Sequence, residues 1–341
     1  MREITRQQRR ALLLGAVLLL LTVALLLLGA SVGSTGLESL RSMHRDALAW
    51  QIVWDIRVPR TLGAWLAGAL LGLAGAIAQG LFRNPLADPY LLGSASGASL
   101  GMALALVLLG GGVAAPMLAP WLRQLGLTGA AFIGAMAAVL LTLALARGVQ
   151  HTLRLLLAGV VVGVVLGAMS SLTMLLVPEV MQTLQAYILG STAFVDWGAC
   201  ALMAAVLLPG LLLAWAGSHV LDGLTLGEAT AASLGLPVAA LRAVLVVVLA
   251  LATGTAVAQT GLIGFVGLAA PHLVRSVTKT THVRLILLSS LMGGVLLMAA
   301  DTLARGLLAP QELPVGVLTA VLGGSYLLWL MHRQGGLGRS P

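Results

Sequence analysis

Long apolar segments, separated by short polar ones, make up almost the whole chain. A membrane helix needs about 20 predominantly apolar residues, and the chain offers ten segments of roughly this kind. They fall at 11–30, 61–80, 91–110, 127–146, 155–177, 198–217, 242–258, 260–275, 285–304 and 314–331. The eighth is short and rich in glycine. The pattern predicts an all-α, polytopic membrane protein with about ten transmembrane helices in one domain, residues 1–341.

Composition points to the same class. Of the 341 residues, 59% are hydrophobic and 9% are charged, whereas about 25% are charged in a soluble domain. The 42 glycines fit this class because small residues let membrane helices pack closely. A single cysteine, Cys200, excludes an intrachain disulfide framework and a multi-cysteine metal site. Because it lies in an apolar run, we expect it to be an inert packing residue.

The positive charges predict the orientation. We interpret 11–30 as the first membrane helix because it is longer than the apolar region of a signal peptide. Ten spans that start inside place both termini in the cytoplasm. Thirteen of the nineteen Lys and Arg residues then fall in cytoplasmic segments, as expected for membrane proteins. The formal net charge of +8 therefore reflects topology, and no basic-aromatic cluster suggests nucleic acid as a partner.

Two connecting segments are longer than a simple turn requires. The outer segment 37–60 carries Trp50 and Trp54 at helical spacing and predicts a short interfacial helix. The inner segment 218–241 is too polar to span the bilayer. It predicts one or two short helices, split by Gly235 and Pro237.

The chain lacks the motifs of common enzymes. It contains no G-x-x-x-x-G-K-[ST], H-E-x-x-H, C-x-x-C or G-x-S-x-G sequence. The middles of the predicted spans are almost free of charge, unlike those of carriers driven by ion gradients. Asp301 and Arg305 lie four positions apart near the end of the ninth span, which predicts an ion pair on the helix surface. Energy for transport would come from another chain. A secondary transporter and a non-transporting membrane scaffold remain the alternatives.

Five stretches together resemble the FecCD family, the permease subunits of type II ABC importers. They are RVPRTLGAWLAGALLGLAGAIAQGLFRNPLADPYLLGSASGASLG (57–101), RLLLAGV (154–160), LTLGEATAASLGLP (224–237), GLIGFVGLAAPHLVR (261–275) and the region 296–331. The resemblance implies a homodimer with the type II importer permease fold in the bacterial inner membrane. It also implies two ATP-binding cassette subunits, which use ATP and Mg, and a periplasmic substrate-binding protein. It implies no cofactor or metal bound by this chain.

The resemblance also assigns site residues. It places coupling to the ATPase at Leu226, Gly227, Glu228, Ala229, Gly235 and Leu236, although Glu228 and Gly235 are one position further apart than in the widespread motif. Without it, 218–241 could equally be a solvated connection.

The resemblance assigns docking of the binding protein to three arginines, Arg57, Arg60 and Arg305. On sequence alone, Arg57 and Arg60 could simply anchor the second span among lipid headgroups.

Two inner loops resemble the cytoplasmic gate of such permeases. Asn84 and Leu86 match the first loop, whereas His151 and Thr152 match the second only weakly. His151 could be read as a haem ligand, but a loop flanked by arginines favours a solvated histidine.

The substrate leaves no signature in the sequence. Members of the family carry ferric siderophores, haem or cobalamin. Because iron chelates dominate the family, we expect an iron compound, with haem ahead of siderophores and cobalamin as the alternative.

Overall fold

A computed structural model describes residues 2–33, 36–37, 47–110, 120–146 and 152–335 of the chain. The α-helices are α1 (Arg2–Ser31), α3 (Ala47–Ile52), α4 (Val58–Leu81), α5 (Ser94–Gly110), α6 (Pro120–Leu145), α7 (Thr152–Leu176), α8 (Met181–Leu189), α9 (Trp197–Thr225), α10 (Glu228–Ser233), α11 (Val238–Thr260), α12 (Val266–Val277), α13 (His282–Gly306) and α14 (Val315–Gly335). The short elements are the π-helix η1 (Val53–Arg57), the 3-10 helices η2 (Pro89–Leu92) and η3 (Pro178–Val180), and two-residue strands β1 (Val32–Gly33) and β2 (Gly36–Leu37), which pair antiparallel.

The all-helical fold predicted from the apolar segments is confirmed, and nine of the ten predicted spans coincide with a helix. Within the described residues, seven helices are long and apolar enough to cross a membrane, and α5 and α14 are shorter apolar helices. The exception is the eighth predicted span, 260–275, in which 261–265 lie outside any helix. The chain leaves α11 at Gly261, which has a φ of 68°, and turns into α12 at Val266.

The predicted limits of the two connecting segments need correction. The inner segment does not begin at 218, because α9 continues to Thr225. Val220, Leu221 and Leu224 are buried in the core, which holds this polar-looking stretch in the helix. Only α10 stands apart between the two long helices, and the break at Gly235 and Pro237 is confirmed. In the outer segment, α3 and η1 lead without a break into α4.

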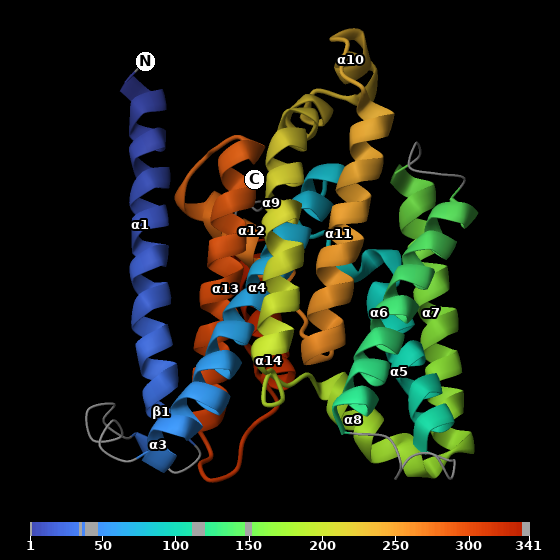
Figure 1. Ribbon diagram of the computed structural model, residues 1–341. Helices are drawn as coiled ribbons and strands as arrows, with labels where there is room; N and C mark the ends of the chain where they lie inside the picture. Colours follow the sequence, from blue (N-terminus) through green and yellow to red (C-terminus); the bar gives the residue numbers. More distant parts are fainter. Residues whose placement is uncertain (1, 34–35, 38–46, 111–119, 147–151, 336–341) are drawn as a thin grey trace.

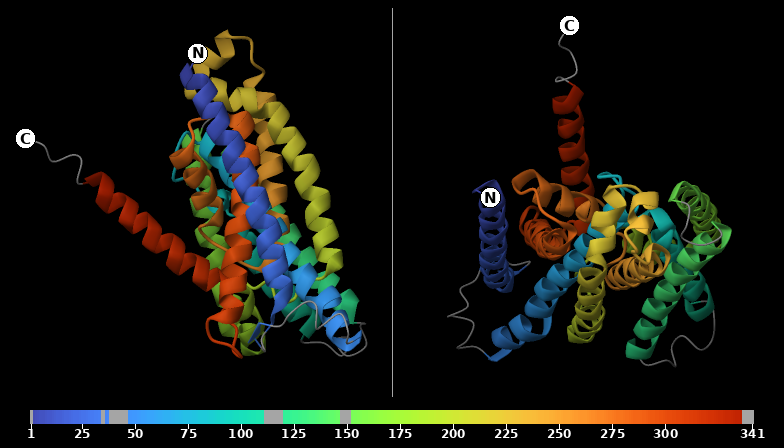
Figure 2. Two further views of the ribbon diagram at one scale, coloured as in Figure 1. Left: turned by 90° about the vertical axis from the view of Figure 1, so that its left-hand side faces the viewer. Right: turned by 90° about the horizontal axis from the view of Figure 1, so that it is seen from above.

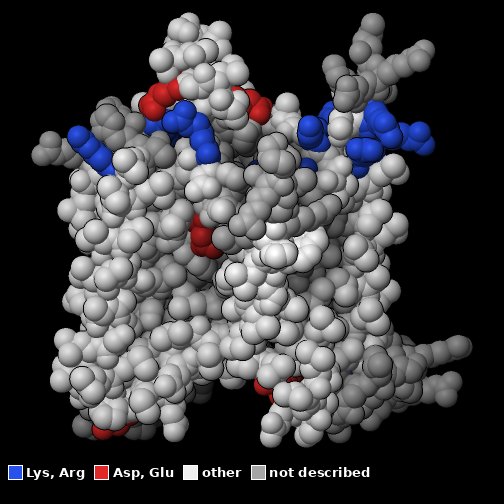
Figure 3. Space-filling view, turned by 180° about the vertical axis from the view of Figure 1, so that it is seen from behind, with Lys and Arg blue, Asp and Glu red and all other residues white. Residues whose placement is uncertain are grey.

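Successive long helices run in alternate directions (Figure 1). The N-terminus and α10 lie at one end, which we name the α10 end, whereas β1 and α3 lie at the other, named the α3 end (Figure 1). On the face shown in Figure 3, the visible Lys and Arg side chains gather at the α10 end. This asymmetry is the one that the arginine distribution predicted.

Helix α4 lies at the centre of the bundle, and most of its residues are buried. Glycines allow its backbone to touch its neighbours. A Cβ atom at Gly72 would lie 2.1 Å from the carbonyl oxygen of Ser289 in α13, and one at Gly75 would lie 1.8 Å from that of Gly267 in α12. These contacts hold the second half of α4 against α12 and α13.

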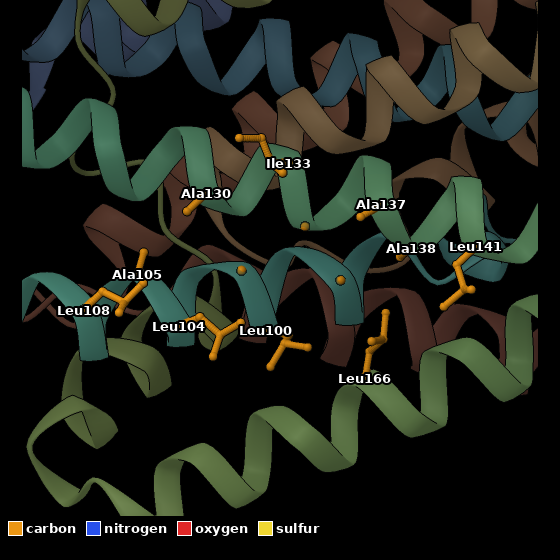
Figure 4. Close-up of a pocket in the computed structure, with 13 residues that line it drawn as sticks. Leu100, Leu104, Ala105, Leu108, Ala130, Ile133, Ala137, Ala138, Leu141 and Leu166 are labelled. Atoms are coloured by element: carbon orange, nitrogen blue, oxygen red, sulfur yellow. The ribbon is translucent and has the colours of Figure 1, made fainter.

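Helices α5, α6 and α7 form a second group beside the α4 core (Figure 1). Gly101 of α5 and Gly134 of α6 bring these two helices into backbone contact. A cavity of about 410 Å³ opens between the three helices and is lined by aliphatic side chains and glycines (Figure 4). Leu104, Ile133 and Leu166 contribute to this lining from α5, α6 and α7. Such a lining offers no charged group to orient a ligand.

Helix α14 leaves the bundle at an angle (Figure 2). Large apolar side chains on it stay exposed, among them Val321, Leu322 and Leu328. The base of the helix is held by Gly316, whose backbone N–H donates a hydrogen bond to the carbonyl oxygen of Gly190 (3.3 Å).

Candidate functional site

A buried cluster of charged groups joins α4 and α13 near the α3 end. Arg60, in the first turn of α4, donates from Nε and Nη2 to Asp301 Oδ1 at 3.3 Å and from Nη1 to Glu312 Oε2 at 2.8 Å. Arg305 approaches the second oxygen of the same carboxylate, with Nη2 2.7 Å from Asp301 Oδ2. Asp301 thus lies between two guanidinium groups, and it also accepts a hydrogen bond from the Thr192 hydroxyl.

Arg305 ties this cluster to the first membrane helix. Its Nη1 donates to the carbonyl oxygens of Gly29 (3.0 Å) and Val32 (3.4 Å), and its Nη2 donates to Thr61 Oγ1 (3.1 Å). The side chain of Arg305 is 2% exposed and that of Asp301 is 0% exposed. The cluster therefore joins the end of α1, the start of α4, the segment before α9, the end of α13 and the loop after α13 that carries Glu312.

The pairing of Asp301 with Arg305 is confirmed, but its predicted place on the helix surface is wrong. Both side chains are buried against α1 and α4 because the start of α4 and the end of α13 pack closely. Of the three arginines predicted to dock a binding protein, Arg60 and Arg305 share one carboxylate and are largely enclosed. Arg57, one turn earlier, is partly exposed at the end of η1. The docking role itself stays a prediction.

The π-helical turn η1 leads directly into the first turn of α4, which carries Arg60. One extra residue per turn redirects the side chains that follow, and such turns often occur at functional sites. The ring of Trp197 packs on that of Trp54 with centroids 5.2 Å apart, and its Nε1 donates to the Trp54 carbonyl oxygen (3.0 Å). These contacts fix η1 to the start of α9.

At the opposite end, α10 protrudes beyond the long helices (Figure 1). Gly227, with a φ of 105°, turns the chain into α10, and Gly235, with a φ of 77°, turns it out. Both angles favour glycine because a side chain would clash with the backbone. Leu226 and Leu234 flank the helix and are 65% and 63% exposed. Two large apolar side chains on a protruding, water-facing element indicate a surface for a partner protein.

The predicted coupling residues lie together on this protrusion. Glu228 is the first residue of α10, and its Oε1 lies 3.1 Å from Nη1 of the buried Arg242 in α11. Ala229 is exposed, whereas Leu236 turns inward and packs near Gly223 of α9. The ion pair connects α10 to α11, and Leu236, just after α10, packs on α9.

The predicted inner gate is described only in part. The loop after α4 is a compact turn in which Asn84 Oδ1 accepts a hydrogen bond from the Leu86 backbone N–H (2.9 Å). The Leu86 side chain is 50% exposed. Thr152 is the first residue of α7, but its side chain and His151 lie outside the described residues. Whether the two loops approach one another stays a prediction.

Sequence reasoning missed the partners of the charged residues. Glu312 and Thr192, which hold Arg60 and Asp301, were not singled out. At the α10 end, Asp222 of α9 accepts a hydrogen bond from the His282 backbone N–H (3.0 Å) and contacts His282 Nδ1 (2.7 Å). Cys200 is buried as expected, with Sγ donating to the Pro59 carbonyl oxygen (3.2 Å). In the described part of the chain, no three His, Cys, Asp or Glu residues gather as a metal site.

Comparisons with known proteins identify the family. Residues 16–333 match the FecCD transport family. The chain is 38% identical over 316 residues to the Yersinia pestis protein named hemin transport system permease protein HmuU, covering 92% of this chain and 93% of that protein. It is 42% identical over 283 residues to the vitamin B12 import system permease protein BtuC of Salmonella typhimurium (strain LT2), covering 83% and 84%.

Solved structures agree with this assignment. A structure described as an inward-facing conformation of a metal-chelate type ABC transporter matches with a TM-score of 0.82 and 27% identity, covering 94% of this chain and 99% of that chain. PsaBC from Streptococcus pneumoniae shares the fold, with a TM-score of 0.57 and 18% identity. The chain, a multi-pass membrane protein, therefore belongs to the FecCD transport family.

Proposed function

We propose that this chain is the permease subunit of an ATP-driven importer that carries an iron compound into the cytoplasm, with haem as the first candidate and ferric siderophores as the second. The observation that carries the proposal is α10, a short helix that protrudes from one end of the bundle with exposed leucines beside it. A permease without its own phosphate-binding loop needs such a surface to receive energy from another chain.

The proposed orientation places α10 and both termini in the cytoplasm. The Lys and Arg side chains visible at the α10 end support this. Two copies of a separate ATPase, which bind ATP and Mg, would then contact Leu226, Gly227, Glu228, Ala229, Gly235 and Leu236. Movement of the ATPase would be passed through the Glu228–Arg242 pair to α11, and through the packing of Leu236 to α9.

The second part of the proposal is a homodimer. Helix α14 splays away from its own bundle and exposes Val321, Leu322 and Leu328 (Figure 2). A second copy would cover this surface, and the substrate path would run between the two copies. Asn84 and Leu86 would line its inner gate, with His151 and Thr152 on the facing loop.

At the outer end we propose that Arg57 and Arg60 meet carboxylates of a periplasmic substrate-binding protein. Arg57 is partly exposed, and Arg60 already binds the carboxylate of Glu312, whose side chain is 30% exposed. Arg305, held by Asp301 and two backbone carbonyls, would keep the start of α4 in place for this contact. Charge complementarity of this kind speeds association and weakens with salt.

The substrate assignment rests on relatives. The Yersinia pestis relative is named for hemin and the Salmonella relative for vitamin B12, so cobalamin is the alternative. The ligand preference of the cognate binding protein tests the choice directly. Tight binding of cobalamin, with neither haem nor a ferric siderophore bound, would show the iron assignment to be wrong.

An ion-gradient carrier is the less favoured mechanism. Such a carrier needs an ionisable group that can load and release an ion within the membrane. Asp301 is buried, but two arginines and a threonine already hold it, which leaves it poorly suited to exchange ions.

Variants at the two ends test the proposed roles. Glu228→Arg reverses the charge at the start of α10 and should reduce co-purification of the ATPase, whereas Ser276→Arg, an exposed site at the same end, should not. Arg57→Glu should weaken binding of the purified binding protein in surface plasmon resonance, and Gln51→Glu, an exposed position on α3, should not. Unchanged co-purification of the ATPase with Glu228→Arg, and unchanged affinity of Arg57→Glu for the binding protein, would show that these surfaces are not the partner sites.

A further inference from the structure

A polar cavity at the α10 end includes Asn84 of the proposed inner gate, but the function proposed above gives no role to its other lining residues. Its volume is about 370 Å³. It lies where the end of α4 and the loop after it meet the ends of α9 and α12 and the start of α13. The lining residues are Gln79, Gly80, Arg83, Asn84, Pro85, Thr225, Arg275, Thr280, His282 and Leu285. Unlike the apolar cavity between α5, α6 and α7, this one has seven polar side chains among its ten lining residues.

Two arginines of the cavity have no carboxylate partner among the described residues. Arg83 and Arg275 both line it, and within the described ranges neither guanidinium contacts an Asp or Glu. Arg275 donates from Nη2 to the side-chain oxygen of Gln79, whose own Nε2 donates to the Leu268 carbonyl oxygen (3.1 Å). Gln79 is thereby fixed, and it holds Arg275 toward the cavity while leaving its charge uncompensated.

His282, the first residue of α13, forms one wall of the cavity and has a fixed ring. Its Nδ1 lies 2.7 Å from Asp222 Oδ1, and Asp222 also accepts its backbone N–H. These two contacts orient the ring, whose Nε2 would be 3.1 Å from a Cβ atom at Gly80. The Nε2 edge therefore faces the end of α4 that lines the cavity. The 25-residue helix α13 begins at this residue, so the positive end of its dipole faces the same space.

A partly buried guanidinium, Arg275, and an exposed one, Arg83, line the same cavity without contacting a carboxylate, and this arrangement favours an anion. Burial of a charge is costly unless a counter-charge is present, and the planar guanidinium matches the oxygens of phosphate with two parallel hydrogen bonds. Arg83 supports this reading through its backbone. Its φ of 48° is unusual for a side-chain-bearing residue, and such strain often marks a ligand-binding position.

We propose that this cavity binds an oxyanion of the phosphate type through Arg83 and Arg275, beside the first turn of α13. The anion bridges the loop that carries Asn84 to α12 and α13 and thereby stiffens the loop. Its source is either the headgroup of an anionic phospholipid or a free phosphate. The site does not depend on which substrate the permease carries.

The test compares the full-length wild-type chain with Arg83→Gln, with the double variant Arg83→Gln/Arg275→Gln, and with Arg154→Gln. Arg154 is an exposed arginine at the same end, in the first turn of α7, and serves as the matched control. Arg83→Gln changes only an exposed loop residue, so it remains informative if the double variant folds poorly. Each protein is placed in phosphatidylcholine nanodiscs, and hydrogen exchange of the 82–88 loop is measured with inorganic phosphate and with chloride at equal ionic strength.

A second arm uses nanodiscs that contain phosphatidylglycerol, followed by native mass spectrometry of the lipid retained. We expect slower exchange with phosphate, retained phosphatidylglycerol, or both, in the wild type and Arg154→Gln. The response in Arg83→Gln should require about tenfold more ligand, as expected when a charge-assisted pair of hydrogen bonds is lost. A response to phosphate assigns a free anion, and lipid retention alone assigns the headgroup. Equal responses in wild type and Arg83→Gln, or no response in either arm, would overturn the proposal.

Discussion

The replacement Asp301→Asn tests the buried charge cluster near the α3 end. The carboxylate is 0% exposed and faces Arg60 at 3.3 Å and Arg305 at 2.7 Å. After the replacement, Arg60 still has Glu312 as a partner, but Arg305, at 2% exposure, keeps only neutral acceptors. Removal of one member of a buried ion pair costs about 3–5 kcal/mol because the remaining charge is buried without a partner. We expect a loss of that size in the free energy of unfolding.

The free energy is measured by titration with sodium dodecyl sulfate in mixed micelles, followed by the fluorescence of the seven tryptophans. Asp55→Asn is the control, since Asp55 is exposed on η1 at the same end, and its replacement should change the free energy by no more than about 0.5 kcal/mol. If Asp301→Asn costs less than about 1 kcal/mol, a scale typical of a single neutral hydrogen bond, the cluster does not hold α1, α4 and α13 together.

Three further predictions concern packing, pH and docking. Gly75→Ala should destabilise the protein by about 1–3 kcal/mol, because the added Cβ would lie 1.8 Å from the Gly267 carbonyl oxygen. Gly129→Ala is the control: a Cβ there has nothing within 4 Å, so the replacement should be neutral or stabilising in the same titration. Burial raises the pKa of Asp88 above its ordinary value, against the lowering effect of the Tyr90 backbone N–H. The contribution of Asp88 to stability is therefore full below the unfolded pKa of 3.8 and is lost as pH rises through the folded pKa. Between pH 4 and 7, the free energy of unfolding should fall less in Asp88→Asn than in the wild type. An identical pH profile in the two proteins would contradict this. Glu312→Gln should release Arg60 and tighten docking of the binding protein in surface plasmon resonance. Glu179→Gln, which changes an exposed acid away from Arg60, should leave the affinity unchanged. Equal or weaker docking in Glu312→Gln would show that Arg60 is not part of the docking surface.

The sequence was sufficient to predict the helical spans. In a bilayer each backbone polar group must be satisfied within the segment, so long apolar runs become helices whatever their neighbours are. The sequence also indicated that the eighth span is weak, because it is short and contains Gly261 and Gly264. The limit at 218 was wrong because local polarity cannot reveal that Val220, Leu221 and Leu224 are buried against other helices.

The partners of the candidate site residues could not be predicted in the same way. Arg305 and Asp301 share one helix, so spacing alone suggested their pairing. Glu312 and Thr192 reach the cluster from 252 and 109 positions away from their partners in the chain, and no periodicity links such distant residues. The burial of Arg60 and Arg305 likewise depends on how closely the start of α4 packs on the end of α13.

The direct test of ATP-driven import is haemin uptake by proteoliposomes that contain this chain, its ATPase and its binding protein, with ATP enclosed on the α10 side. We predict uptake that requires ATP, stops when vanadate blocks the ATPase, and continues when a protonophore removes the proton gradient. Uptake that persists with vanadate and collapses with the protonophore would contradict the proposed function.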